Sequence, residues 1–252
     1  MKNINLSKAI IPNSFTALNI LAGFFSIIYS SHEEFIIASV LIFAAGVFDV
    51  LDGLLARMLK SSSQFGVELD SLGDVISFGA APAFLIYQCY LYEYGWIGLL
   101  VSSCLLVFGA FRLARFNTQV EDVTIKVDFK GLPIPISAII IASFVIAFHN
   151  KEGIVHQFEY FVIPLVLLNS FLMVSNIRYN KMPKPSDFGL GEKIIYSLVL
   201  VFAILLIYAS DGKALFYLFL SMVLFGIFRH IFYMIFQDKF TGSVKKKKQD
   251  EE

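Results

Sequence analysis

The run Asp49-Val-Leu-Asp52-Gly53-Leu-Leu-Ala56-Arg57, followed after eight residues by Gly66-Val-Glu-Leu-Asp70-Ser-Leu-Gly-Asp74, places two pairs of aspartates at the edges of apolar segments. The members of each pair are three or four residues apart, so each pair projects from one face of a helix. Four carboxylates at membrane depth repel one another and resist desolvation. Nearby Arg57 and Lys60 could pair with them, but two bases cannot neutralise four acids. Two divalent cations would neutralise the four carboxylates. Ligand sets made only of oxygen atoms favour Mg²⁺ or Mn²⁺ over zinc.

The composition indicates an integral membrane protein. The 252 residues are 57% hydrophobic and only 16% charged, with 27 Phe, and several apolar stretches approach the roughly 20 residues that cross a bilayer. Lys2 and Lys8 precede the first apolar run, which we interpret as a retained helix rather than a cleaved signal. Cys89 and Cys104 show no CxxC spacing and are expected to be small buried hydrophobic residues.

The apolar runs predict an all-α integral membrane protein, a bundle of about eight transmembrane helices. We expect a single membrane domain over residues 1–252, with a catalytic core at 10–150 that contains the aspartate motif at 49–74. Two accessory helices and a tail that is first basic and then acidic would occupy 177–252. The expected helices cover about 11–31, 34–57, 71–92, 95–116, 133–150, 157–176, 192–210 and 213–236.

The distribution of Lys and Arg predicts the orientation in the membrane. With eight helices, 18 of the 20 basic residues fall on the side that holds both termini, and only Lys151 and Lys213 fall on the other. The excess of positive charge marks the cytoplasmic side. We therefore expect a multi-pass protein of the cell (inner) membrane with both termini and the motif loop in the cytoplasm. The lysine run 245–248 is either a solvated tail or a contact for anionic lipid.

The motif is expected to form a helical hairpin just inside the cytoplasmic surface. Asp70 and Asp74 would lie at the start of the third helix, where the helix N-terminus exposes N–H donors. Gly53 and Ala56 are small residues beside the acids, which either allow a phosphate to approach or serve helix packing.

The complete pattern D-x2-D-G-x2-A-R-x8-G-x3-D-x3-D resembles the CDP-alcohol phosphatidyltransferase family. The resemblance implies a CDP-lipid donor, CMP as leaving group, a hydroxyl acceptor and two divalent metal ions. It also implies a homodimer, since the family is often dimeric. By motif position, Asp74 would be the general base as well as a possible ligand. The implied metal ligands are Asp49, Asp52, Asp70 and Asp74, and the implied nucleotide-binding residues include Asp52, Gly53, Ala56, Arg57 and Gly66.

The segment that begins with Pro12 resembles the P-N-x2-T element of the family. Asn13 and Thr16 lie three apart on one helical face and would hydrogen-bond the cytosine or the ribose. Capping of the first helix after Pro12 is the alternative interpretation.

Two further segments resemble the phosphatidylserine synthases, the subgroup of the family that uses L-serine. One is Ser77-Phe-Gly-Ala-Ala-Pro-Ala83; the other is Phe111-Arg-Leu-Ala-Arg-Phe-Asn117, followed by Phe129-Lys-Gly-Leu-Pro-Ile-Pro135. Arg112 and Arg115 are candidates for binding a lipid phosphate or the acceptor, because guanidinium groups suit phosphate and carboxylate. Lys130 is a further candidate for the same role. The two arginines could instead anchor the helix at the headgroups.

These features predict an enzyme that transfers the phosphatidyl group of CDP-diacylglycerol to the hydroxyl of L-serine, giving phosphatidylserine and CMP. The expected partners are the two substrates and membrane lipids, with no nucleic acid. The same chemistry with inositol phosphate, glycerol phosphate or an archaeal-type CDP-lipid donor remains open. A divalent-cation or proton transporter fits less well, because the acids gather at one edge and no internal repeat is visible.

Overall fold

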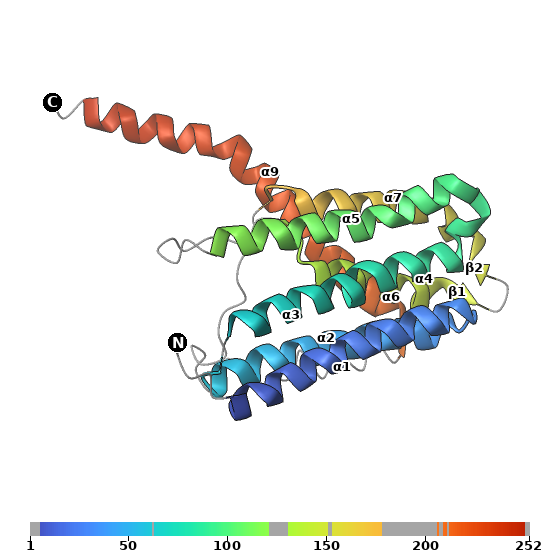
Figure 1. Cartoon of the computed structure of the whole chain (residues 1–252). Helices are drawn as coiled ribbons and strands as arrows, with labels where there is room; N and C mark the ends of the chain where they lie inside the picture. The colour runs from blue at the N-terminus through green and yellow to red at the C-terminus, as the bar shows by residue number, and fades with distance from the viewer. Residues whose placement is uncertain are drawn as a thin grey trace.

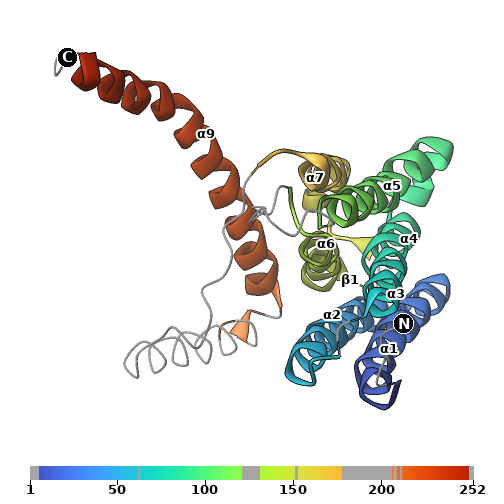
Figure 2. The ribbon, with the colours of Figure 1, turned by 60° about the vertical axis from the view of Figure 1, so that its left-hand side comes forward.

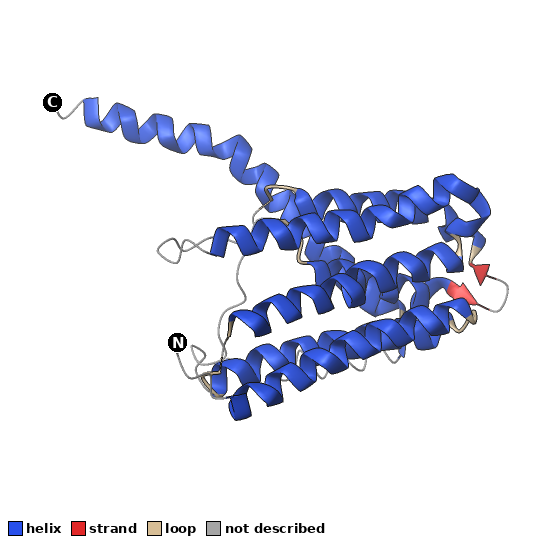
Figure 3. Ribbon diagram, in the orientation of Figure 1, coloured by secondary structure: helices blue, strands red, loops and turns tan. Residues whose placement is uncertain are grey.

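The computed structural model describes residues 6–61, 63–120, 131–150, 153–177, 206, 209–210 and 212–249. These residues form helices apart from one short β-hairpin, in which β1 (His149–Asn150) pairs with β2 (Gly153–Ile154) (Figure 3). Six helices in the described part of the chain are long and apolar enough to cross a membrane. The predicted all-α membrane architecture is confirmed.

The first two helices pack as an antiparallel hairpin (Figure 1). They are α1 (Leu6–Ser31) and α2 (Phe35–Met58). Small residues let the two backbones approach closely: Ser26 Oγ donates a 2.8 Å hydrogen bond to the carbonyl of Ala38, and both residues are buried. Glu33 in the connecting turn has φ of 62°, a left-handed conformation that non-glycine residues rarely adopt.

The third span is one continuous rod with an irregular middle. It consists of α3 (Gln64–Asp74), the π-helical segment η1 (Val75–Ala80) and α4 (Ala81–Cys89). The backbone N–H of Ala81 donates to the carbonyl of Ile76, five residues back, instead of the usual four. Such π segments occur frequently at functional sites. The rod packs against α1 and starts seven residues before the predicted helix at 71–92.

The second half of the chain packs beside this group (Figure 2). The 3₁₀ turn η2 (Leu91–Tyr94) leads into α5 (Gly95–Val120), which is followed by α6 (Ile134–Phe148), α7 (His156–Val174) and α9 (Lys213–Gln249). α6 is almost entirely buried, and its Phe144 and Phe148 contact Phe216 of α9 at ring-centroid distances of 5.4 and 5.3 Å. It therefore forms the centre of the apolar core.

Seven of the eight predicted helices correspond to these elements with shifted bounds. The predicted helix at 192–210 lies almost entirely outside the described residues. α6 has 15 residues, fewer than the roughly 20 that cross a bilayer. The count of eight spans and the cytoplasmic position of both termini stay predictions.

Candidate active site

Three of the four motif aspartates converge on one point. One carboxylate oxygen each from Asp49, Asp70 and Asp74 lies within 4.8 Å of the others. Asp49 comes from α2, and the other two come from successive turns of α3. Asp74 is buried, and Asp49 and Asp70 are half-buried. The spacing of three and four residues thus focuses the acids across the helical hairpin, as the sequence predicts.

The donor chemistry of this cluster fits a hard divalent cation. All ligand atoms are carboxylate oxygens, which suit Mg²⁺ and Mn²⁺. One oxygen each of Asp70 and Asp74 is buried without a hydrogen-bond partner among the described residues. A buried ionised carboxylate without a partner is strongly unfavourable, and a divalent cation could serve as that partner. No metal identity follows from the cluster alone.

The fourth aspartate lies beside the cluster rather than in it. Asp52 is buried, with 5% of its surface exposed, and its Oδ2 accepts a 2.8 Å hydrogen bond from Thr16 Oγ1 of α1. It remains near enough to Asp49 and Asp70 to repel both electrostatically. Asp52 therefore connects the aspartate cluster to α1. Its predicted role as a metal ligand is not tested by this arrangement.

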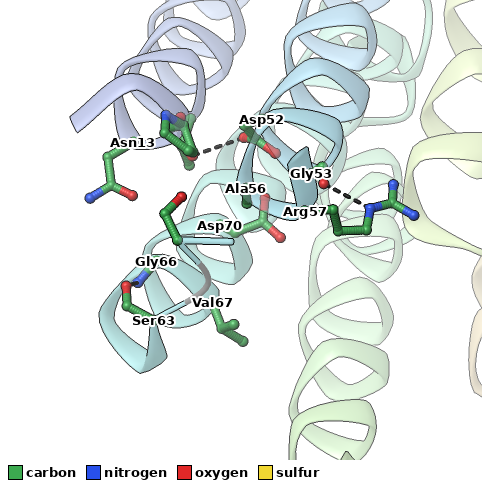
Figure 4. A pocket seen from close by; sticks show the side chains of 12 residues that line it. Asn13, Asp52, Gly53, Ala56, Arg57, Ser63, Gly66, Val67 and Asp70 are labelled. Atoms are coloured by element: carbon green, nitrogen blue, oxygen red, sulfur yellow. Dashed lines mark hydrogen bonds between the residues drawn. The ribbon is translucent and has the colours of Figure 1, made fainter. Parts of the chain in front are cut away.

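A pocket of about 200 Å³ adjoins the cluster and opens toward the ends of the helices (Figure 4). α1, α2 and the start of α3 supply its walls, and Asp52 and Asp70 line it as well. Every residue predicted to contact the nucleotide is in its lining: Asn13, Thr16, Asp52, Gly53, Ala56, Arg57 and Gly66. The structure thus brings these seven residues together, although their binding role stays a prediction.

Two details suit this pocket to an anionic ligand. Arg57 Nε donates a 2.8 Å hydrogen bond to the carbonyl of Gly53, one turn earlier, which fixes the exposed guanidinium at the pocket wall. Its terminal nitrogens make no hydrogen bond among the described residues and can bind phosphate. At Gly53 an added Cβ would meet only Arg57, at 3.9 Å, so the backbone there is open to a ligand.

The expected position of the second aspartate pair at a helix start is wrong. α3 already begins at Gln64, because Ser63 caps it by accepting a 3.0 Å hydrogen bond from the N–H of Gly66. Asp70 and Asp74 therefore lie in the last two turns of α3. The helix N-terminus, with Ser63 and Gly66, lines the nucleotide-sized pocket instead of the aspartate cluster.

The predicted basic residues have different surroundings. Arg112 of α5 is buried, its Nε has no hydrogen-bond partner among the described residues, and it interacts electrostatically with Asp74. Arg115 instead donates to the backbone carbonyls of Val174 (3.0 Å) and Ser175 (3.4 Å) at the end of α7. Neither arginine lines the pocket described above, and Lys130 lies outside the described residues.

Two polar features of the site were not assigned from the sequence. Asn19 of α1 is fully buried in the wall against α3, and Ser77 of the π-helical segment donates a 2.8 Å hydrogen bond to its carbonyl. At the outer edge of α3, Asn117 Nδ2 donates a 3.0 Å hydrogen bond to Ser71 Oγ. The signal available for the first was an asparagine within the apolar run that follows Thr16.

Comparison with known proteins gives one consistent result. The sequence model of the family described as CDP-alcohol phosphatidyltransferase matches residues 9–168. A CDP-diacylglycerol–serine O-phosphatidyltransferase of Helicobacter pylori is 38% identical over 229 residues, 89% of this chain and 92% of that protein. The enzyme of the same name from Methanocaldococcus jannaschii is 34% identical over 86% of this chain and 92% of its own length. An archaetidylserine synthase of Methanothermobacter thermautotrophicus is 34% identical over 68% of this chain and 70% of its own length.

Proposed function

Because the chain belongs to the CDP-alcohol phosphatidyltransferase family, we propose that it transfers the phosphatidyl group of CDP-diacylglycerol to the hydroxyl of L-serine. The products are phosphatidylserine and CMP. The observation that carries this proposal is the convergence of Asp49, Asp70 and Asp74 beside a pocket lined by all seven candidate nucleotide-binding residues. Serine as acceptor is supported by the relatives, whose names all specify the serine product or substrate.

Two groups of residues bind two different parts of CDP-diacylglycerol. Arg57 and the small residues Gly53 and Ala56 receive the phosphates of the CDP moiety, while Asn13 and Thr16 hydrogen-bond the cytosine or the ribose. The acyl chains extend into the surrounding lipid, because the helices that line the pocket are long and apolar enough to cross the membrane. This placement is consistent with acids that lie about two to three turns inside the helices rather than in a loop.

Two Mg²⁺ or Mn²⁺ ions held by the four aspartates would supply charge neutralisation and polarisation of the pyrophosphate. Asp49, Asp70 and Asp74 are held ready on α2 and α3, which both pack against α1, and Thr16 fixes the orientation of Asp52. A site arranged in advance needs no reorganisation during the reaction.

The transfer step is an in-line displacement at the phosphorus that carries diacylglycerol. The hydroxyl oxygen of serine forms the new P–O bond, and the bond from that phosphorus to the oxygen shared with CMP breaks. Asp74 accepts the proton of the serine hydroxyl, and CMP leaves with the shared oxygen and its electron pair. General-base assistance of this kind contributes about 10²- to 10⁴-fold to a rate.

Arg112 binds the carboxylate of serine or the lipid phosphate. It is buried beside Asp74, and its unpartnered Nε leaves it able to form a two-point contact with either group. Inositol phosphate and glycerol phosphate carry a phosphate, which a guanidinium group also binds, so the choice of serine rests on the relatives rather than on this contact.

The Lys and Arg count favours the cytoplasm for the end of the bundle where α1 begins, α2 ends and α3 begins. The active site then opens to the side on which soluble serine and CMP are handled. We further propose the cell (inner) membrane as location and a homodimer as assembly. Cross-linking of the protein in native membranes, followed by gel electrophoresis in detergent, tests the dimer.

The decisive experiment supplies the purified protein with CDP-diacylglycerol, Mn²⁺ and one acceptor at a time, and follows CMP release. L-Serine should support turnover, and inositol phosphate and glycerol 3-phosphate should not. The Asp49→Asn variant serves as the inactive control. Turnover with another acceptor but not with serine would refute the acceptor assignment, and a clear preference for an ether-linked CDP-lipid would replace the donor.

A further inference from the structure

The side chain of Asn19 has no hydrogen-bond partner although it is completely buried. Its residue is 0% exposed, and both Nδ2 and Oδ1 lack a partner among the described residues. A buried polar group that is left unsatisfied costs about 1–3 kcal/mol. A carboxamide with both of its polar atoms unsatisfied is therefore an unfavourable choice for the interior of α1, unless a ligand or water satisfies it in another state of the enzyme.

Asn19 lies at the level of the aspartate cluster. It is one turn beyond Thr16, whose hydroxyl binds Asp52. A Cβ added to Gly73 would be 3.6 Å from Asn19 Nδ2, so the carboxamide packs against the backbone of the residue that precedes Asp74. The carbonyl of Asn19 accepts the hydrogen bond of Ser77 from the next turn of the same rod.

The unpartnered polar atoms around this level share one property. Oδ1 of Asp70 and Oδ1 of Asp74 are buried without a partner, as are both side-chain atoms of Asn19. A cation that enters with its bound water would give all of these polar atoms a partner, since Mg²⁺ and Mn²⁺ usually keep several waters. The carboxylates bind the ion directly, whereas an amide oxygen and an amide N–H suit the water around it.

We propose that Asn19 is a positioning residue of the metal site: its carboxamide hydrogen-bonds the water that accompanies the ions and thereby raises their affinity. The inference rests on the metal site of the proposed function. Outer groups of this kind alter metal affinity by about 10- to 100-fold when they are removed. The same role explains why a polar side chain is retained where an apolar one would pack without an unsatisfied group.

The test measures Mn²⁺ binding to the purified protein in detergent, without lipid, nucleotide or serine, by the electron paramagnetic resonance signal of free Mn²⁺. Asn19→Leu keeps the branched shape and removes both polar atoms. We expect its Mn²⁺ affinity to fall about 10- to 100-fold, while its thermal unfolding temperature in EDTA equals or exceeds that of the wild type. Asn19→Asp keeps the oxygen acceptor and adds a charge, so its affinity should be at least that of the wild type.

Asn169→Leu is the matched control. Asn169 is also a buried asparagine with an unpartnered Oδ1, but it lies on α7, where its Nδ2 donates to the carbonyl of Leu165. Its replacement should leave Mn²⁺ affinity unchanged.

Three outcomes would overturn the role of Asn19. They are wild-type Mn²⁺ affinity in Asn19→Leu, an unfolding temperature of that variant in EDTA below the wild-type value, and failure of both Asn19→Leu and Asn19→Ala to fold. A wild-type protein that binds no Mn²⁺ would instead refute the metal site of the proposed function. The two failures are therefore distinguishable.

Discussion

Replacing Gly23 with alanine tests the close packing of α1 against the π-helical segment. A Cβ at position 23 would lie 2.6 Å from the Cα of Ser77 and would also collide with its hydroxyl. Carbon atoms in contact are about 3.5–4.0 Å apart, so α1 and the rod must separate by roughly 1 Å. Overpacking of this kind costs about 1–3 kcal/mol. Separation also stretches the 2.8 Å hydrogen bond from Ser77 to the carbonyl of Asn19.

Gly46→Ala provides a matched comparison. Its added Cβ would meet Ile139 at 3.9 Å and Phe78 at 4.0 Å, which are ordinary contacts. Alanine is favoured over glycine inside a helix by roughly 0.5–1 kcal/mol, so this variant should be as stable as the wild type or more stable. Gly23→Ala should lower the thermal unfolding temperature in detergent by roughly 2–12 °C. It should also weaken Mn²⁺ binding, since Ser77 lies three residues after Asp74. Equal unfolding temperatures for the two variants would refute the packing argument.

Five further substitutions address the site and its surroundings. Asp49→Asn should abolish CMP release and raise the unfolding temperature in EDTA, because it removes one of several mutually repelling buried charges; a lower temperature in EDTA would contradict this. Asp74→Asn should lower kcat about 10²- to 10⁴-fold and preserve binding of CDP-diacylglycerol; lost donor affinity with a normal rate at saturation would place the base elsewhere. Thr16→Val removes a hydrogen bond to a carboxylate worth about 1.5–3 kcal/mol, so kcat/KM for CDP-diacylglycerol should fall roughly 10- to 150-fold, and an unchanged value would exclude its orienting role. Arg112→Lys should raise the KM for serine or for the lipid, whereas Arg115→Lys should lower only the unfolding temperature; identical kinetics of both variants and the wild type would remove Arg112 from substrate binding.

The sequence predicted three of the four acids of the cluster, because spacing on a helix determines which side chains share a face. Asp49 and Asp70 are distant in sequence, yet their carboxylates lie together, whereas Asp52 instead accepts a hydrogen bond from Thr16. The pocket residues followed from the same logic, together with the family resemblance. The start of α3 did not, because Ser63 caps the helix within a run of serines in which each residue could serve equally well.

The sequence pattern could not predict contacts between residues that are far apart in the chain. Arg115 binds backbone carbonyls about sixty residues later in the chain. Every residue has a backbone carbonyl, so no residue type in the sequence identifies such a partner. Asn19 stood out in an apolar run, but its significance depends on its packing against the backbone of Gly73 in another helix. The two arginines three residues apart looked equivalent in sequence, and only tertiary packing separates them.

The π-helical segment has a consequence for how this chain tolerates insertions and deletions. In an α-helix each residue turns the chain by about 100°, whereas the widened turn at Val75–Ala80 holds one residue more than an α-helical turn. The wider turn absorbs this extra residue, so the aspartate half of the rod and α4 keep nearly the rotation of an uninterrupted helix. Deleting one residue there would restore α-helical geometry and leave Asp70 and Asp74 facing Asp49. A deletion elsewhere in the rod would turn every later residue by about 100°, so this short segment is the place where the rod best tolerates a change of length.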